Sequence, residues 1–214
     1  IEPNAPAVVL CKLDDVNYGV SDGSFCIIYD IKKRIKILKS EGKNYANVSF
    51  NYVDIDGNSM NSEKISGLKA TAFNMVDGKI VKTKMDDKLV FRERLDKEDM
   101  LMKFTVPQVK VGTVIEYQYK ISSPLFHILK SWYAQTSIPT MYANYNLVIP
   151  EYFRFSIENT GMHKMDQERG LTGCTFNYEG ETLNCNGQEY KFTAQDLPSI
   201  KDDDFVWDAE DYSN

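Results

Sequence analysis

The side chains in this chain that could do covalent chemistry are its thiols and imidazoles. Cysteines stand at positions 11, 26, 174 and 185, and histidines at positions 127 and 163. A nucleophilic thiol needs a histidine to take its proton and a third group to orient that histidine. Cys174 and His163 lie eleven positions apart, close enough for folding to bring them together. A disulfide accounts for Cys174 more economically, so we expect no catalytic residue in the chain.

The cysteine spacing favours disulfide bonds. A two-residue turn at Glu179-Gly180 would fold TFNY onto ETLN and place Cys174 directly opposite Cys185, close enough for a bridge. Cys11 and Cys26 flank a second candidate hairpin, in which VVLC and FCIIY are separated by the turn-rich LDDVNYGVSDGS. This second pairing is weaker because a long connection leaves the register open. Two bridges would favour an exported protein in an oxidising compartment, whereas four buried free thiols in a cytosolic domain remain the alternative.

The sequence contains no recognisable motif for binding a metal or a cofactor. The histidines and cysteines lack close spacings such as CxxC or HExxH, and the chain has no P-loop, GxGxxG or GxSxG sequence. Two of the many carboxylates could converge as a glycosidase pair, and nothing in the sequence singles out a pair. We therefore expect no metal site and no cofactor.

Aromatic residues offer a route to binding rather than catalysis. Trp132, Tyr133, Tyr142 and Tyr145 form a candidate platform for stacking on sugar rings or on a peptide. The alternative is that these side chains fill the core.

The charge distribution limits the partners. The chain has 25 basic and 31 acidic residues, a net charge of −6, and its basic residues are scattered, so we expect no nucleic-acid partner. The one basic run, Lys32-Lys33-Arg34, lies between apolar runs, and we interpret it as the solvated outer face of a long strand rather than an anion-binding patch. No apolar segment is long enough to span a bilayer.

These residues must be positioned by strands. In GTVIEYQYKISS, residues 112–123, apolar and polar side chains alternate as in a half-buried strand. Fourteen such runs follow one another with turn signals between them, of which Asp77-Gly78 is the strongest hairpin signal. Only RERLDKEDM, residues 92–100, has any helical character, and we interpret it as a charged connection. The pattern predicts an all-β fold, an antiparallel β-sandwich of two large sheets with little helix.

The sequence divides into three parts. Residues 1–6 are expected to be a flexible lead-in, residues 7–196 a single β-sandwich domain, and residues 197–214 an acidic linker toward a missing downstream domain. The chain starts at Ile1 instead of an initiator methionine, so we expect that an N-terminal piece has been removed.

Four segments carry a resemblance to a known family. They are DVNYGVSDGSFCIIYDIKKRIKIL, KISGLKATAFNMVDGKIVKTK, FTVPQVKVGTVIEYQYKISSP and SWYAQTSIPTMYANYNLVIPEYF. The chain resembles the family called domain of unknown function 3857, from about Ala7 to the tail. This resemblance implies a β-sandwich at the N-terminus of an exported bacterial protein, periplasmic or on the cell surface of a Gram-negative bacterium. It also implies a transglutaminase-like domain with a Cys-His-Asp triad further along the same polypeptide, so that this chain itself lacks the triad.

Three functions remain open. The first is a non-catalytic accessory domain that positions, or provides a binding surface for, a downstream transglutaminase- or protease-like domain. The second is a stand-alone cell-surface module that binds glycan or peptide. The third is an enzyme that uses converging carboxylates or Cys174 with His163.

Overall fold

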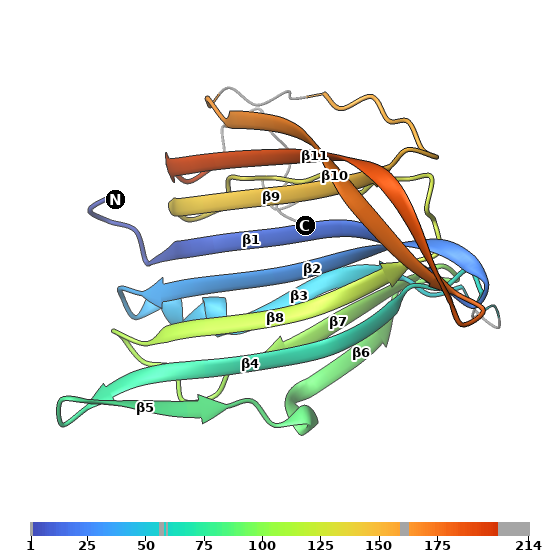
Figure 1. The fold of residues 1–214 in the computed structure, drawn as a ribbon. Helices are drawn as coiled ribbons and strands as arrows, with labels where there is room; N and C mark the ends of the chain where they lie inside the picture. The colour runs from blue at the N-terminus through green and yellow to red at the C-terminus, as the bar shows by residue number, and fades with distance from the viewer. Residues whose placement is uncertain (1, 56–57, 59, 159–162, 201–214) are drawn as a thin grey trace.

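Two β-sheets of unequal size make up the fold in the computed structural model, which describes residues 2–55, 58, 60–158 and 163–200 (Figure 1). The large sheet has eight strands in the order β10-β11-β9-β1-β2-β8-β4-β5, and the small sheet has the order β3-β7-β6. The strands are β1 (Ala7–Ser21), β2 (Ser24–Ile37), β3 (Asn47–Val53), β4 (Lys64–Val76), β5 (Lys79–Lys84), β6 (Val90–Arg94), β7 (Asp99–Thr105), β8 (Val114–Ser123), β9 (Thr140–Pro150), β10 (Asp166–Tyr178) and β11 (Glu181–Leu197). Two short 3-10 helices are described, η1 (Glu41–Ala46) and η2 (Asp87–Leu89). The all-β prediction is confirmed, although the second sheet is small.

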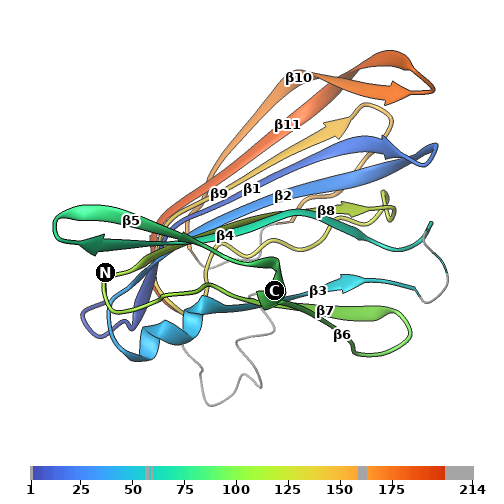
Figure 2. The same ribbon diagram turned by 90° about the horizontal axis from the view of Figure 1, so that it is seen from below.

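Figure 2 shows the small sheet as a separate layer on one side of the large sheet, far from β10 and β11. Two aromatic contacts between described residues join the layers. Phe50 of β3 stacks on Tyr119 of β8 with ring centroids 4.1 Å apart, and Phe104 of β7 meets Tyr117 of β8 edge-on at 5.5 Å. The small sheet therefore packs against the β8 part of the large one.

Tight turns set the registers of the long hairpins. Asp22-Gly23, Asp77-Gly78 and Glu179-Gly180 each hold two consecutive residues at positive φ, between 49° and 83°. Positive φ at both central positions defines the type I′ turn, whose twist matches that of paired strands. The hairpins predicted at Asp77-Gly78 and Glu179-Gly180 are confirmed.

The alternation along β8 is also confirmed. Ile115, Tyr117, Tyr119 and Ile121 are at most 8% exposed and belong to the core between the layers. The residues between them point to the outer face, where Glu116 pairs with Arg34 and Lys32 of β2. Lys32 and Arg34 thus lie on the solvated outer face expected for the basic run.

The connection between β8 and β9 must cross one face of the large sheet. β8 and β1 are both antiparallel to β2, and β9 is parallel to β1, so β8 and β9 run in the same direction with two strands between them. Strands that run in the same direction need a crossover rather than a tight turn. Residues 124–139 make this crossover and lie over the inner face of β1 and β2.

The two ends of the described chain meet. The Ser199 main-chain N–H donates to Oε1 of Glu2 at 2.8 Å, and the main-chain N–H of Ile200 donates to the Thr136 carbonyl at 2.9 Å. Most of the expected acidic linker, residues 201–214, lies outside the described residues.

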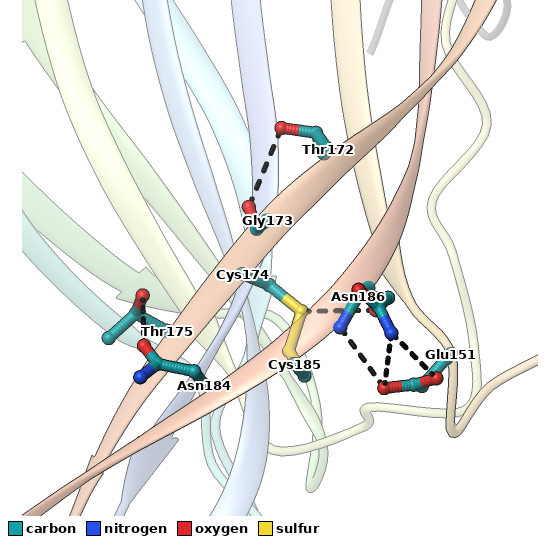
Figure 3. Close-up of a disulfide and its surroundings, with 8 residues drawn as sticks. All are labelled: Glu151, Thr172, Gly173, Cys174, Thr175, Asn184, Cys185 and Asn186. Carbon is teal, nitrogen blue, oxygen red and sulfur yellow. Dashed lines mark hydrogen bonds between the residues drawn. A yellow bond between two sulfur atoms is a disulfide. The ribbon is translucent and has the colours of Figure 1, made fainter.

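A disulfide joins the two strands of the C-terminal hairpin. Cys174 of β10 is directly opposite Cys185 of β11, with their Cα atoms 5.0 Å apart (Figure 3). Next to it, the side chain of Glu151 accepts from the main-chain N–H of Asn186 at 3.0 Å. The opposition of the two cysteines follows from the Glu179-Gly180 turn, as the sequence indicated.

The second bridge expected from the sequence does not form. Cys11 and Cys26 are both free thiols in the structure. The stretch LDDVNYGVSDGS is strand up to Ser21 rather than a long loop, so Cys11 lies opposite Arg34 while Cys26 lies opposite Gly19. The two cysteines are separated by eight positions along the ladder, about 26 Å at the rise of an extended strand.

We expect iodoacetamide to modify two cysteines in the unreduced, denatured protein and four after reduction. The reason is that the Cys174–Cys185 bridge blocks one pair and leaves Cys11 and Cys26 open. Mass spectrometry counts the added groups. Four modified cysteines without reductant would contradict the bridge.

Cys174→Ser should lower the free energy of unfolding by at most about 3 kcal/mol, because closing a short loop removes little entropy from the unfolded chain.

Candidate functional site

A cavity of about 600 Å³ lies between the large sheet, β3 and the crossover segment 130–138. This volume falls within the range of ligand pockets in proteins. Its floor is the inner face of β1, β2, β8 and β9, one wall is β3, and the other wall is the crossover. The cavity exists because the small sheet covers only part of the large one.

The strand registers fix which side chains form the floor. One row across the sheet consists of Ala143, Lys12, Lys33 and Tyr117, each opposite the next on the neighbouring strand. The next row, two residues along each strand, consists of Tyr145, Asp14, Ile31 and Tyr119. Three charged side chains therefore lie at the centre of an otherwise apolar and aromatic surface.

The charges of Lys12 and Asp14 compensate each other only in part. The ammonium of Lys12 donates to the Tyr133 carbonyl at 2.8 Å and lies 3.8 Å from Oδ2 of Asp14. Burial lowers the pKa of Lys12, and the neighbouring Asp14 opposes that shift. Lys12 also lies over the Trp132 ring, 5.8 Å from its centroid, at the distance of a cation–π contact.

Asp14 is held by the crossover. Its Oδ2 accepts from Nε1 of Trp132 at 2.5 Å, while its Oδ1 has no hydrogen-bond partner among the described residues. The residue is 5% exposed. Burial raises the pKa of the Asp14 carboxyl, and Lys12 and the Trp132 hydrogen bond oppose the rise.

Lys33 is the unusual member of the floor. Its side chain forms no hydrogen bond and no ion pair with any described residue, although it lines the cavity between Lys12 and Tyr117. Burial, followed by the charge of Lys12, lowers the pKa of Lys33 to about 7, while Asp14 opposes the shift. A lysine with such a pKa exchanges its proton near neutral pH and serves as an anion site when protonated.

Four tyrosines on the floor of the cavity stay protonated. Burial raises the pKa of Tyr29 to about 12 and raises the pKa values of Tyr117, Tyr119 and Tyr145 further. Their hydroxyl groups are therefore hydrogen-bond donors as well as acceptors at neutral pH. The floor thus combines aromatic rings with neutral polar groups.

Both ends of the opening between β3 and the crossover are bridged. At one end the hydroxyl groups of Tyr45 and Ser137 lie 3.4 Å apart. At the other end the buried Glu63 carboxylate binds the Lys130 ammonium at 2.8 Å and accepts from the main-chain N–H of Val53 at 2.9 Å. These bridges define a slot over the cavity, bounded by β3 on one side and segment 130–138 on the other.

The aromatic residues singled out in the sequence separate into two groups. Trp132, Tyr133 and Tyr145 all line the cavity. Tyr142 belongs to the opposite face of β9, because it is out of phase with the inward-facing Ala143 and Tyr145. Trp132 and Tyr133 belong to the crossover wall and Tyr145 to the floor of a cavity, so the three aromatics do not form a flat exposed platform.

The Cys174 and His163 pair does not come together as a thiol site. Cys174 is bonded to Cys185, and His163 is exposed. Among residues 2–55, 58, 60–158 and 163–200, no cluster of three or more metal-ligating side chains is found. Within the same residues, no helix is long and apolar enough to cross a bilayer.

Sequence reasoning missed Lys12 and Asp14, and the expectation that Lys33 lies on the solvated outer face was wrong, because its side chain lines the cavity. For Lys33 a signal existed, because it is in phase with Ile31 and Ile35 and therefore belongs to the buried face of β2. The basic run as a whole hid this phase, since Lys32 and Arg34 do face solvent.

Replacing Lys33 by methionine should stabilise the protein at pH 6 and have little effect near pH 10. The folded-state pKa of about 7 is below the ordinary value of 10.5, so the unfolded chain holds more protons between these values. The cost of burying the ammonium is full below pH 7 and disappears as the pH rises to about 10.5. We expect a gain in the free energy of unfolding of about 1–3 kcal/mol at pH 6, discounted for water in the cavity.

Urea unfolding of both proteins across this pH range measures the difference. The groups on the elements around Lys33 are common to both proteins; they are Lys12, Asp14, Tyr29, Tyr45, Tyr117, Tyr119, Lys130, Tyr133 and Tyr145. Lys32→Met, one residue away on the outer face, is the matched control and should show no such pH trend. A constant difference for Lys33→Met would contradict the assignment.

Comparison with known structures shows the fold in larger proteins. A candidate protease from Parabacteroides distasonis ATCC 8503 matches with a TM-score of 0.59 at 11% identity, over 97% of this chain and 39% of that one. An M1 zinc metallopeptidase from Deinococcus radiodurans matches over 91% of this chain and 44% of its own, at 9% identity and with a TM-score of 0.33. This chain thus spans less than half the length of either protein.

Sequence comparison identifies the family. No curated protein matches the chain. The family model described as Domain of Unknown Function with solved-structure structure (DUF3857) matches residues 28–201, which is most of the chain. The resemblance seen in the sequence is confirmed, and the protein belongs to the domain of unknown function 3857 family.

Proposed function

We propose that this chain is a non-catalytic accessory domain that positions, or provides a binding surface for, a downstream protease- or transglutaminase-like catalytic domain. The observation that carries the proposal is the match to the candidate protease from Parabacteroides distasonis, in which nearly all of this chain corresponds to 39% of a longer protein. A domain that recurs as a fraction of a larger chain has its role beside the remaining domains.

The chemistry of the described residues supports a non-catalytic role. Cys174 is held in a disulfide, and the cavity contains lysines, a carboxylate and tyrosines but no thiol. Buried polar groups on rigid strands are suited to holding a ligand in one orientation.

We also propose that the protein is exported, to the periplasm or the cell surface of a Gram-negative bacterium. The Cys174–Cys185 disulfide supports this location, because such bonds persist in oxidising compartments.

Reading the coding sequence past the codon for Asn214 tests the accessory role. We expect it to continue into a domain with cysteine, histidine and aspartate in papain-like order. Residues 1–214 alone should neither hydrolyse casein nor incorporate a fluorescent amine into it above background. An immediate stop codon, or activity of the isolated chain, would overturn the proposal.

A second candidate function is a stand-alone module that binds glycan or peptide. The specific observation in its favour is that Trp132, Tyr133 and Tyr145 all line the cavity. Aromatic rings in a concave site recognise the faces of sugars and of peptide side chains.

Glycan and peptide arrays probed with residues 1–214 test this second function. We expect Trp132→Ala to weaken binding at least tenfold, because the indole lines the cavity and holds Asp14. Tyr142→Ala is the matched control, since this aromatic lies on the opposite face of β9. Arrays without any bound ligand, or equal losses for the two variants, would remove the candidate.

A further inference from the structure

The charge of Lys33 is uncompensated within the cavity. Of the other charged groups that line it, Lys12 lies beside Asp14 and Lys130 is paired with Glu63. Lys33 has no anion within ion-pair distance among the described residues. The cavity therefore suits a ligand with one negative charge that pairs with the Lys33 ammonium.

Asp14 leaves a second group unpaired. Its Oδ1 is buried and has no hydrogen-bond partner in the described part of the chain, and buried polar atoms in native proteins are normally paired. Lys33 is directly opposite Lys12, so Asp14 and Lys33 are diagonal neighbours, about 7–8 Å apart between Cα atoms. An N–H group close to a carboxylate on the same molecule could reach both residues at once.

β3 presents a free edge beside the same cavity. The main-chain hydrogen bonds of Ala46 with Val106 and of Asp54 with Glu98 show that the even-numbered residues of this segment bond toward β7. The odd-numbered residues point away from β7. On that side Val53 is paired with Glu63, but no described residue bonds to the main chain of Ser49 or Asn51.

The slot has the dimensions of a short extended segment. Residues Asn47–Asn51 line the cavity consecutively, which means that the edge of β3 faces it as well as its side chains. Five extended residues span about 16 Å. An unpaired strand edge binds an extended chain by adding it to the sheet.

We propose that this cavity binds the carboxyl-terminal end of an extended peptide, with the terminal carboxylate on Lys33, the last N–H on Asp14 and the main chain along the free edge of β3. The inference deepens the proposed binding role, on which it rests, by naming the ligand class. A peptide end supplies the single negative charge, the adjacent N–H donor and the strand that the three features require. The apolar and aromatic walls would receive its side chains.

The experiment compares two peptide mixtures. N-acetylated tetrapeptides, randomised over Ala, Leu, Val, Phe, Tyr and Ser, are prepared with a free carboxylate or with a carboxamide end. Each mixture is incubated with residues 1–214 at pH 6, where Lys33 is protonated, and the retained peptides are measured by mass spectrometry. We expect at least tenfold greater retention of the acids than of the amides.

Variants separate the two halves of the site. Lys33→Met should abolish the preference for acids, whereas Lys32→Met, on the outer face of the same strand, should keep it. Ser49→Pro, which removes an unpaired N–H from the edge of β3, should lower retention of tetrapeptides at least fivefold. Melting temperatures close to that of the unmodified protein show that each variant is folded.

Two further probes identify other occupants. 4-Phenylbutyrate carries a carboxylate on an apolar body but no main chain, and we expect it to bind at least tenfold more weakly than the peptide acids. Oligogalacturonate carries carboxylates on sugar rings, and we expect it not to bind.

Equal retention of acids and amides, no retention of either, or an unchanged preference in Lys33→Met would overturn the inference. Phenylbutyrate binding as tightly as the peptides would refute the pairing with β3. Binding of oligogalacturonate instead of the peptides would show that the ligand is an acidic glycan, and it would also overturn the inference. None of these results bears on whether a catalytic domain follows Asn214, so this inference and the accessory role can fail separately.

Discussion

The ladder between β1 and β2 places Lys12 directly opposite Lys33 on the inner face of the large sheet, and the cavity is organised around these two charges. Like charges directly across a ladder destabilise a sheet, and burial adds a desolvation cost. Asp14, on the same face two residues from Lys12, offsets one of the two charges. The charge of Lys33 is left without a partner of its own among the described residues, and burial, followed by the charge of Lys12, lowers its pKa.

The crossover from β8 to β9 keeps this arrangement in place. It supplies the Tyr133 carbonyl to Lys12 and the Trp132 indole to Asp14, while its Lys130 reaches the buried Glu63. An apolar side chain at Lys33 would remove the charge without losing any of these contacts. Lys33 therefore makes the fold less stable than a methionine at this position would, as is common where a site serves binding rather than folding.

Most of the fold could be predicted from the sequence because it depends on local signals. The period of two along residues 112–123 and the turns at Asp77-Gly78 and Glu179-Gly180 each specify a strand or a hairpin within about ten residues. The prediction of a Cys11–Cys26 disulfide was wrong because LDDVNYG forms a strand instead of a loop, and the turn of this hairpin lies at Asp22-Gly23. Composition favoured a loop there, and pairing with β2 overrode it.

The site could be predicted only in part, because it is assembled from distant segments. A bulge between Val9 and Cys11 shifts the phase of β1, and it is this shift that turns Lys12 and Asp14 inward. The crossover that covers them has no periodicity, so its aromatic residues gave no indication of which face they would meet. Only Lys33 carried its own signal, since it shares the phase of Ile31, Ile35 and Ile37.

The difference in size between the sheets explains why the cavity stays open. Strands β2 and β1 have 14 and 15 residues, whereas β3 has 7, and the small sheet packs through Phe50 and Phe104 onto β8. No strand of the described chain pairs with the free edge of β3, so the floor beneath that edge is covered only by the crossover. A third element could be added there without moving either sheet, and the unpaired groups of Ser49 and Asn51 already have the pattern that a fourth strand would complete.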